Sequence, residues 1–218
     1  MSKISSSDGD VDCNIKPKIV FTAEQVSEAV QFLQAGGVLA YPSESVWGLG
    51  CDAFNEQALQ RIFALKERDL GKGLIVLTDR ATRLKDLIVD EIDGEQAIER
   101  IQQIDAQDML NAGRATSWVV PVRQNVLPSL LTGDFADLAV RITPHPELSS
   151  LCQGLISQSN PFGLLVSTSC NTAGKTPAGN LTQAYRYFGD AVGYLDCESL
   201  GFVQPSQIIE LATGKILR

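Results

Sequence analysis

Three closely spaced cations are the residues of this chain best suited to chemistry. Lys66, Arg68 and Lys72 fall in one short stretch, beside Gly71 and Gly73 in an expected turn. Arginine offers a bidentate fork to phosphate or carboxylate groups and lysine a point charge, so the three together could neutralise a polyphosphate. The alternative is that Lys66 and Arg68 only complement the dipole at the end of a helix.

Two hydroxyl-rich turns could complete a pocket around such an anion. Residues 43–45 (Ser-Glu-Ser) follow an apolar run that stops at Pro42, and residues 167–171 (Ser-Thr-Ser-Cys-Asn) follow another apolar run. Small hydrogen-bonding side chains at the ends of strands can line a nucleotide or amino-acid site. They also satisfy the backbone of their own turns, which is the alternative interpretation.

Arg141 interrupts the apolar run 138–142, and a cation on a buried strand needs a partner. Two interpretations stay open: an ion pair, for example with Glu44 or Asp52, or a clamp on a substrate carboxylate. Glu44 could itself be a base or the partner of one of the cations. His145 stands between two prolines and is interpreted as a turn residue rather than a base.

Neither a P-loop nor a metal cluster is expected. Residues 173–176 (Ala-Gly-Lys-Thr) copy the tail of a P-loop, but its first glycine would fall on Ser169, and Pro177 and Gly179 interrupt the helix that should follow. The five cysteines are scattered and the chain has one histidine, which argues against clustered zinc ligands. We expect reduced thiols in a cytoplasmic protein.

Strands and helices of mixed order must position these residues. Apolar runs predict strands at 38–41, 73–78, 116–122, 138–142, 164–167, 207–211 and 216–217. Helical spacing predicts helices after a capping box at 22–25, after Asn55, and at 79–88, 94–111, 148–156 and 181–188. The pattern favours one mixed α/β domain over residues 19–218, preceded by a disordered lead-in at 1–18.

Composition limits the classes of partner. The chain of 218 residues is 44% hydrophobic and has no apolar run near the ~20 residues of a membrane helix. Its net charge of −8 is concentrated between residues 86 and 108, where eight acidic residues are opposed only by Arg100. This segment is expected to be a solvated helix face, and it argues against binding a broad phosphate backbone.

Five segments in order resemble the YrdC/TsaC family of threonylcarbamoyl-AMP synthases. They are YPSESVWGLGCD, KERDLGKGL, LAVRITPHP, STSCN and PSQII with a terminal arginine, and they span about residues 20–218. The resemblance implies an open, twisted, mixed β-sheet flanked by helices, with a concave cleft. It also implies an enzyme that makes L-threonylcarbamoyladenylate and pyrophosphate from L-threonine, bicarbonate and ATP with Mg²⁺, for N6-threonylcarbamoyladenosine at position 37 of tRNA.

The resemblance also assigns roles to residues. The family's KxR…SxN signature implies that catalytic, ATP-side groups are Lys66, Arg68, Ser169 and Asn171. Further ATP-side residues are Thr116 or Ser117 and the terminal Arg218. The threonine side is expected to comprise Ser43, which stands where the family usually has threonine, Lys72, Ser167 and Ser206, with Arg141 as the clamp. A handover to the tRNA threonylcarbamoyl-transfer complex and a contact with tRNA are implied as well.

Two departures from the family pattern leave alternatives. The usual Trp-Pro-Gly-Pro segment is replaced at 111–117, and SCN stands for SAN at 169–171. A non-catalytic binder of tRNA or double-stranded RNA on the same fold is the main alternative. A different enzyme on a related scaffold, for carbamoyl transfer or sugar phosphates, would be expected to carry extra domains or acidic metal motifs.

Overall fold

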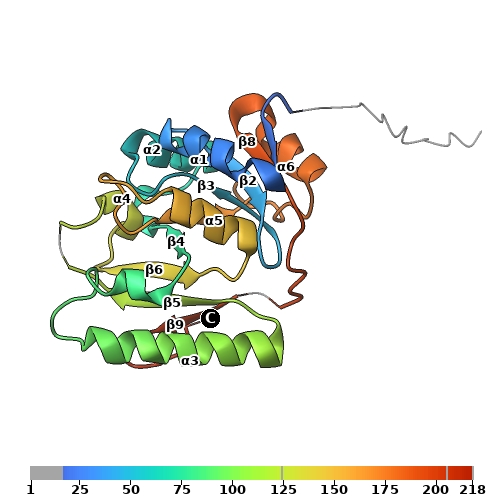
Figure 1. Cartoon of the computed structure of the whole chain (residues 1–218). Helices are drawn as coiled ribbons and strands as arrows, with labels where there is room; N and C mark the ends of the chain where they lie inside the picture. Colours follow the sequence, from blue (N-terminus) through green and yellow to red (C-terminus); the bar gives the residue numbers. More distant parts are fainter. Residues whose placement is uncertain (1–16, 124, 205, 218) are drawn as a thin grey trace, which may run out of the picture.

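A single mixed β-sheet organises the protein (Figure 1). The computed structural model describes residues 17–123, 125–204 and 206–217, so the predicted lead-in lies outside this description except for residues 17 and 18. The described residues form nine strands in the order β1-β8-β2-β3-β7-β4-β6-β5-β9. The sheet contains both parallel pairs such as β4–β6 and antiparallel pairs such as β3–β7, which confirms the predicted mixed α/β class. The strands are β1 (Val20–Thr22), β2 (Leu39–Pro42), β3 (Trp47–Gly50), β4 (Ile75–Thr78), β5 (Thr116–Pro121), β6 (Asp137–Ile142), β7 (Leu165–Ser169), β8 (Gly193–Asp196) and β9 (Gln207–Glu210).

The helices agree with the predicted ones in most places. They are α1 (Val26–Gln34), α2 (Glu56–Lys66), α3 (Gly94–Ala112), α4 (Ser129–Thr132), α5 (Pro146–Gly154) and α6 (Leu181–Phe188). The capping box at Thr22 and Gln25 is present, although the first turn after it is a 3-10 turn. The helix predicted at 79–88 is wrong, because this segment forms only a 3-10 turn at Ala81–Leu84. None of the helices that the structure describes has the length and apolar character needed to cross a membrane.

Three strands were missed by the sequence interpretation. β1, β3 and β8 are three or four residues long, and β3 and β8 contain glycine, which weakens a strand signal. The predicted strand at 216–217 is only an isolated bridge from Ile216 to Ile209. Short strands of this kind are stabilised by their neighbours in the sheet rather than by their own composition.

The two faces of the sheet are covered unequally. Leu77 of β4 and Leu165 of β7 pack in a core with α1 and α5. On the opposite face, Trp118 of β5 and Val140 of β6 pack with α2, α3 and α6. Figure 1 shows α3 running along the end of the sheet formed by β5 and β9.

Strand β6 marks where the cover ends. Leu138 and Val140 are buried, whereas Ala139 and Arg141, which face the other way, remain partly exposed. The same alternation occurs in β9, where Ile208 and Glu210 are partly exposed. Helix α5 covers β4, but it has fewer contacts with β6 and β9. The face of β6, β5 and β9 turned away from α3 is therefore open, and it forms the floor of the site.

Candidate functional site

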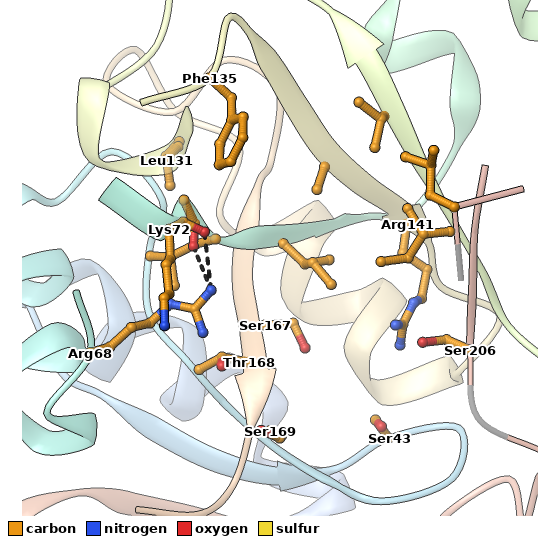
Figure 2. Close-up of a pocket in the computed structure, with 18 of the residues that line it drawn as sticks. Ser43, Arg68, Lys72, Leu131, Phe135, Arg141, Ser167, Thr168, Ser169 and Ser206 are labelled. Atoms are coloured by element: carbon orange, nitrogen blue, oxygen red, sulfur yellow. Dashed lines mark hydrogen bonds between the residues drawn. The ribbon is translucent and has the colours of Figure 1, made fainter. Parts of the chain in front are cut away.

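A cavity of about 860 Å³ lies on this open part of the sheet. Figure 2 shows Arg68 and Lys72 at one end, Arg141 and Ser206 at the other, and hydroxyl groups between them. Its walls bring together seven of the residues that the sequence singled out: Ser43, Arg68, Lys72, Arg141, Ser167, Ser169 and Ser206. They come from five separate segments, so the fold makes one site out of motifs that are distant in the chain.

Arg68 is aimed by backbone carbonyl groups. Helix α2 is capped at its start by Asn55, whose Oδ1 accepts from the Ala58 amide at 3.0 Å, and it ends with Glu67 at a left-handed φ of 49°. The Nη2 group of Arg68 then donates to the carbonyl oxygens of Lys72 (3.1 Å) and Gly73 (2.9 Å) (Figure 2). Its Nε is buried and has no hydrogen-bond partner. The guanidinium is therefore fixed in place by backbone carbonyl groups at the wall of the cavity, where it can attract an anion.

The turn that carries Lys72 rests on a second turn without intervening side chains. Gly73 and Gly133 have positive φ angles of 50° and 62°. A Cβ atom on Gly133 would lie 2.4 Å from the carbonyl oxygen of Gly71 and 2.5 Å from the amide nitrogen of Gly73. Only glycine allows both the conformation and this approach, which explains the glycines at positions 73 and 133.

Lys66 does not share the cavity with the other two cations of its segment. Its side chain is buried, with 6% of the residue exposed, and it does not line the cavity. The Nζ group donates to the carbonyl oxygens of Ser169 and Asn171 (2.8 Å for the latter) and to Asn171 Oδ1 at 3.2 Å. Burial lowers the pKa of Lys66 to about 8. Lys66 thus ties the end of α2 to the loop after β7.

That loop is also ordered by its own side chains. Ser169 Oγ donates to Asn171 Oδ1 at 2.6 Å, and Asn171 Nδ2 donates to the carbonyl oxygen of Lys175 at 2.6 Å. Ser169 lines the cavity, whereas Asn171 does not. Burial raises the pKa of the Cys170 thiol to about 12, so this cysteine is a protonated core residue at neutral pH. These hydrogen bonds confirm the turn interpretation of the loop, and its role as a binding site stays a prediction.

Arg141 has the ion-pair partner that one of the open interpretations named. Its Nη1 lies 3.0 Å from Glu44 Oε2, and its Nε donates to Ser117 Oγ at 3.1 Å. Thr143 Oγ1 donates to the other carboxylate oxygen of Glu44 at 2.8 Å. Asp52 instead accepts from the Asn160 amide. Because Arg141 also lines the cavity, the ion pair and a role as a clamp are compatible.

The remaining predicted ATP-side residues do not reach the cavity walls. Thr116 and Ser117 are buried, and neither lines the cavity. Thr116 Oγ1 donates to Asp108 Oδ2 at 2.6 Å. Arg218 lies outside the described residues, although Leu217 before it lines the cavity. For Thr116, Ser117 and Arg218, contact with ATP therefore stays a prediction.

The acidic segment was expected to be a solvated helix face, but part of helix α3 is buried against the sheet. Asp105 of α3 accepts from the indole Nε1 of Trp118 at 3.0 Å, while its second oxygen is buried without a partner. Burial raises the pKa of Asp105 to about 7. Helix α3 therefore supports the underside of β5, opposite the cavity.

Sequence reasoning missed the apolar part of the site. The cavity is also lined by Val119, Leu131, Phe135, Ala139 and Ile208, and by the carboxylates of Asp137 and Glu210. Phe135 is 66% exposed although it is aromatic. Alternation in β6 and β9 was the available signal, but it does not tell an open face from a covered one.

The chain matches a family model and named relatives over most of its length. The model Sua5_yciO_yrdC, described as "Telomere recombination", matches residues 31–218. The threonylcarbamoyl-AMP synthase of Moraxella catarrhalis (strain BBH18) is 55% identical over 201 residues, which cover 92% of this chain and 98% of that protein. The threonylcarbamoyl-AMP synthase of Psychrobacter arcticus (strain DSM 17307 / VKM B-2377 / 273-4) is 43% identical over 209 residues, which cover 89% of this chain and 96% of that protein.

Solved structures share the fold. The P. abyssi Sua5 protein complexed with L-threonine superposes with a TM-score of 0.76 at 22% identity, covering 92% of this chain and 57% of that one. E. coli YciO superposes with a TM-score of 0.67 at 17% identity, covering 92% and 93%. This chain spans a little over half of the Sua5 protein, and almost all of YciO. With the family model and the closely related sequences, these findings show that the chain belongs to the Sua5/YciO/YrdC family.

Proposed function

We propose that this protein is a threonylcarbamoyl-AMP synthase that joins L-threonine, bicarbonate and ATP. The observation that carries the proposal is the cavity itself, which gathers Arg68, Lys72, Arg141 and a row of hydroxyl groups in one space (Figure 2). Relatives that cover nearly the whole chain bear this enzyme's name. An amino acid and a nucleotide together need both anion-binding groups and apolar walls, and the cavity offers both.

The reaction needs positioned charge rather than a nucleophilic side chain. The amine of threonine and bicarbonate give a carbamate and water, a carbamate oxygen attacks the α-phosphate, and pyrophosphate leaves. Fixed cations that neutralise charge at the phosphates accelerate this type of displacement. Arg68, the predicted ATP-side cation, and Lys72, the predicted threonine-side cation, lie at the same end of the cavity. We place the meeting of the carbamate and the α-phosphate at this end.

The residues present fit a magnesium-bound nucleotide. Mg²⁺ takes oxygen ligands, often one or two carboxylates together with substrate phosphates, and Asp137 and Glu210 line the cavity. Magnesium would supply further charge neutralisation at the phosphates. Ser43 and Ser206 are proposed to contact threonine from the Arg141 end. The product would pass to the complex that modifies tRNA.

The test is pyrophosphate release by the full chain with ATP, Mg²⁺ and bicarbonate, with and without L-threonine. Mass spectrometry of the same mixture looks for threonylcarbamoyladenylate. We expect threonine-dependent release that Lys72→Met abolishes and that Lys175→Met leaves unchanged. Lys175 is an exposed lysine that does not line the cavity, so it is the matched control. Absence of threonine-dependent release, together with RNA binding that falls steeply with salt, would instead support the RNA-binding alternative.

A further inference from the structure

A second group of chemically capable side chains lies away from the cavity walls. His145, Glu147 and Cys197 each present a ligand atom, and these atoms all lie within 4.8 Å of one another. His145 and Glu147 stand at the start of α5, and Cys197 directly follows β8. None of the three lines the cavity. Nothing in the sequence indicates this cluster, because Cys197 is far from the other two residues along the chain.

The hydrogen bonding of His145 leaves a lone pair aimed into the cluster. The imidazole is fully buried, and its Nε2 lies 2.9 Å from the carbonyl oxygen of Glu198. A carbonyl oxygen only accepts, so Nε2 carries a proton, and with this tautomer the neutral ring would present the lone pair of Nδ1 to the cluster. Nδ1 is buried without a hydrogen-bond partner, although it lies only 3.1 Å from Glu147 Oε2. Two acceptors that face each other at this distance require a positive species between or beside them.

We propose that His145, Glu147 and Cys197 form a zinc-binding site. Imidazole nitrogen, thiolate sulfur and carboxylate oxygen are the three ligand types that Zn²⁺ takes in proteins. Ligand atoms around a tetrahedral zinc ion lie about 3.5 Å apart, so the cluster needs only a small contraction to enclose the ion. A histidine that binds a metal usually donates its other ring N–H to a nearby acceptor, which fixes the ring. Here the carbonyl oxygen of Glu198 is that acceptor for His145.

The charges of the cluster balance a divalent cation. Binding transfers the thiol proton of Cys197 to solvent, so one thiolate and one carboxylate neutralise Zn²⁺. The helix dipole places partial positive charge at the start of α5, which makes cation binding there less favourable. Two anionic ligands offset this effect.

The site would fasten one wall of the cavity. Residues 197–206 run from Cys197 to Ser206, which lines the cavity. On the way, the Leu200 and Phe202 amides donate to the carbonyl oxygens of Ser43 (3.3 Å) and Glu44 (2.7 Å). Zinc at Cys197 would anchor the start of this segment to α5.

The ligands are also connected to Arg141. The His145 amide donates to Thr143 Oγ1 at 3.3 Å, Thr143 Oγ1 donates to Glu44 at 2.8 Å, and Glu44 pairs with Arg141. Zinc would therefore hold the threonine end of the cavity in shape without touching the substrates.

Cobalt substitution of the full chain tests the proposal. All proteins carry Cys13→Ser, so that a thiolate signal does not come from the N-terminal segment. After chelation and dialysis, one equivalent of Co²⁺ should give near-ultraviolet thiolate-to-cobalt absorption, and Zn²⁺ should remove it. Cys197→Ser should lose this absorption. Cys152→Ala, which changes a thiol buried on the same helix α5, should keep it.

A second pair of variants keeps the test decisive if Cys197→Ser fails to fold. Glu147→Gln removes a ligand and should weaken Zn²⁺ binding by about tenfold or more. Glu198→Gln removes a neighbouring charge but keeps the carbonyl that holds His145, and its affinity should stay within about threefold. Added Zn²⁺ should raise the melting temperature of the parent protein and not that of Cys197→Ser.

Three results would overturn the site. They are no thiolate absorption in the parent protein, equal absorption in Cys197→Ser, or equal losses of affinity in Glu147→Gln and Glu198→Gln. A protonated imidazole paired with Glu147 would then explain the short contact. These measurements detect metal binding and not enzyme turnover, so a negative result would not argue against the proposed synthase activity.

Discussion

Replacing Lys66 with methionine separates its structural role from a purely catalytic one. Methionine keeps an apolar stem of similar length but removes all the donors of the ammonium group. The carbonyl oxygens of Ser169 and Asn171 and the amide oxygen Oδ1 of Asn171 would then lose their charged partner. The loop after β7 should detach from the end of α2.

The size of the effect follows from the number and exposure of these bonds. Hydrogen bonds to charged groups contribute about 1.5–3 kcal/mol each, which gives roughly 3–6 kcal/mol for the two carbonyl groups. Ser169 is exposed, so water can replace part of the loss. We therefore expect Lys66→Met to lower the free energy of unfolding by about 2–3 kcal/mol.

Urea unfolding followed by circular dichroism measures this change. The midpoint should fall while the m-value stays constant, which identifies a change in stability rather than in the unfolded state. Lys72→Met is the control, because Lys72 is an exposed cavity cation, and its unfolding free energy should change by less than about 0.5 kcal/mol. A stability of Lys66→Met within the same 0.5 kcal/mol of the parent protein would refute the assigned structural role.

Three further predictions follow from single residues. Burial raises the pKa of Asp105 to about 7, so the folded state keeps a proton that the unfolded state releases above about pH 4, and the free energy of unfolding should fall as the pH rises from 4 to 7. At pH 8, Asp105→Asn should therefore be more stable than the parent protein by about 1–3 kcal/mol in urea titrations. A difference between the two proteins that does not change with pH would contradict this reasoning. The Cβ atom of Gly133→Ala would meet backbone atoms within 3 Å, so this variant should have a clearly lower melting temperature than Gly113→Ala. Gly113 has a similar positive φ but open space around it, so its substitution should lower the free energy of unfolding by only about 1 kcal/mol. Equal effects of the two variants would show that the close approach at Gly133 is unimportant. Glu44→Gln removes the charge that orients Arg141. This variant should raise the threonine KM about tenfold, while the ATP KM should change less than about threefold. Equal changes in the two KM values would argue against Arg141 as the threonine clamp.

Local pattern was sufficient for most of the secondary structure. Asn55 capped its helix as expected, because a cap depends on one side chain and an amide three residues later. Most of the apolar runs became strands, since burial of such residues dominates local choice, although the run at 216–217 forms only a bridge. The order of motifs also sufficed to identify the family, which the matches over residues 31–218 confirm.

Contacts between distant segments decided the rest. A sequence shows that Lys66 and Arg68 are cations, but only the contact of the end of α2 with Ser169 and Asn171 buries the first and leaves the second at the cavity. The open face of β6 and β9 depends on where α5 happens to end its cover, which no alternation pattern encodes. Likewise, His145 and Cys197 meet because β8 ends beside the start of α5. Helices and strands follow from interactions within a few residues, whereas burial, partners and sites follow from how those elements are packed.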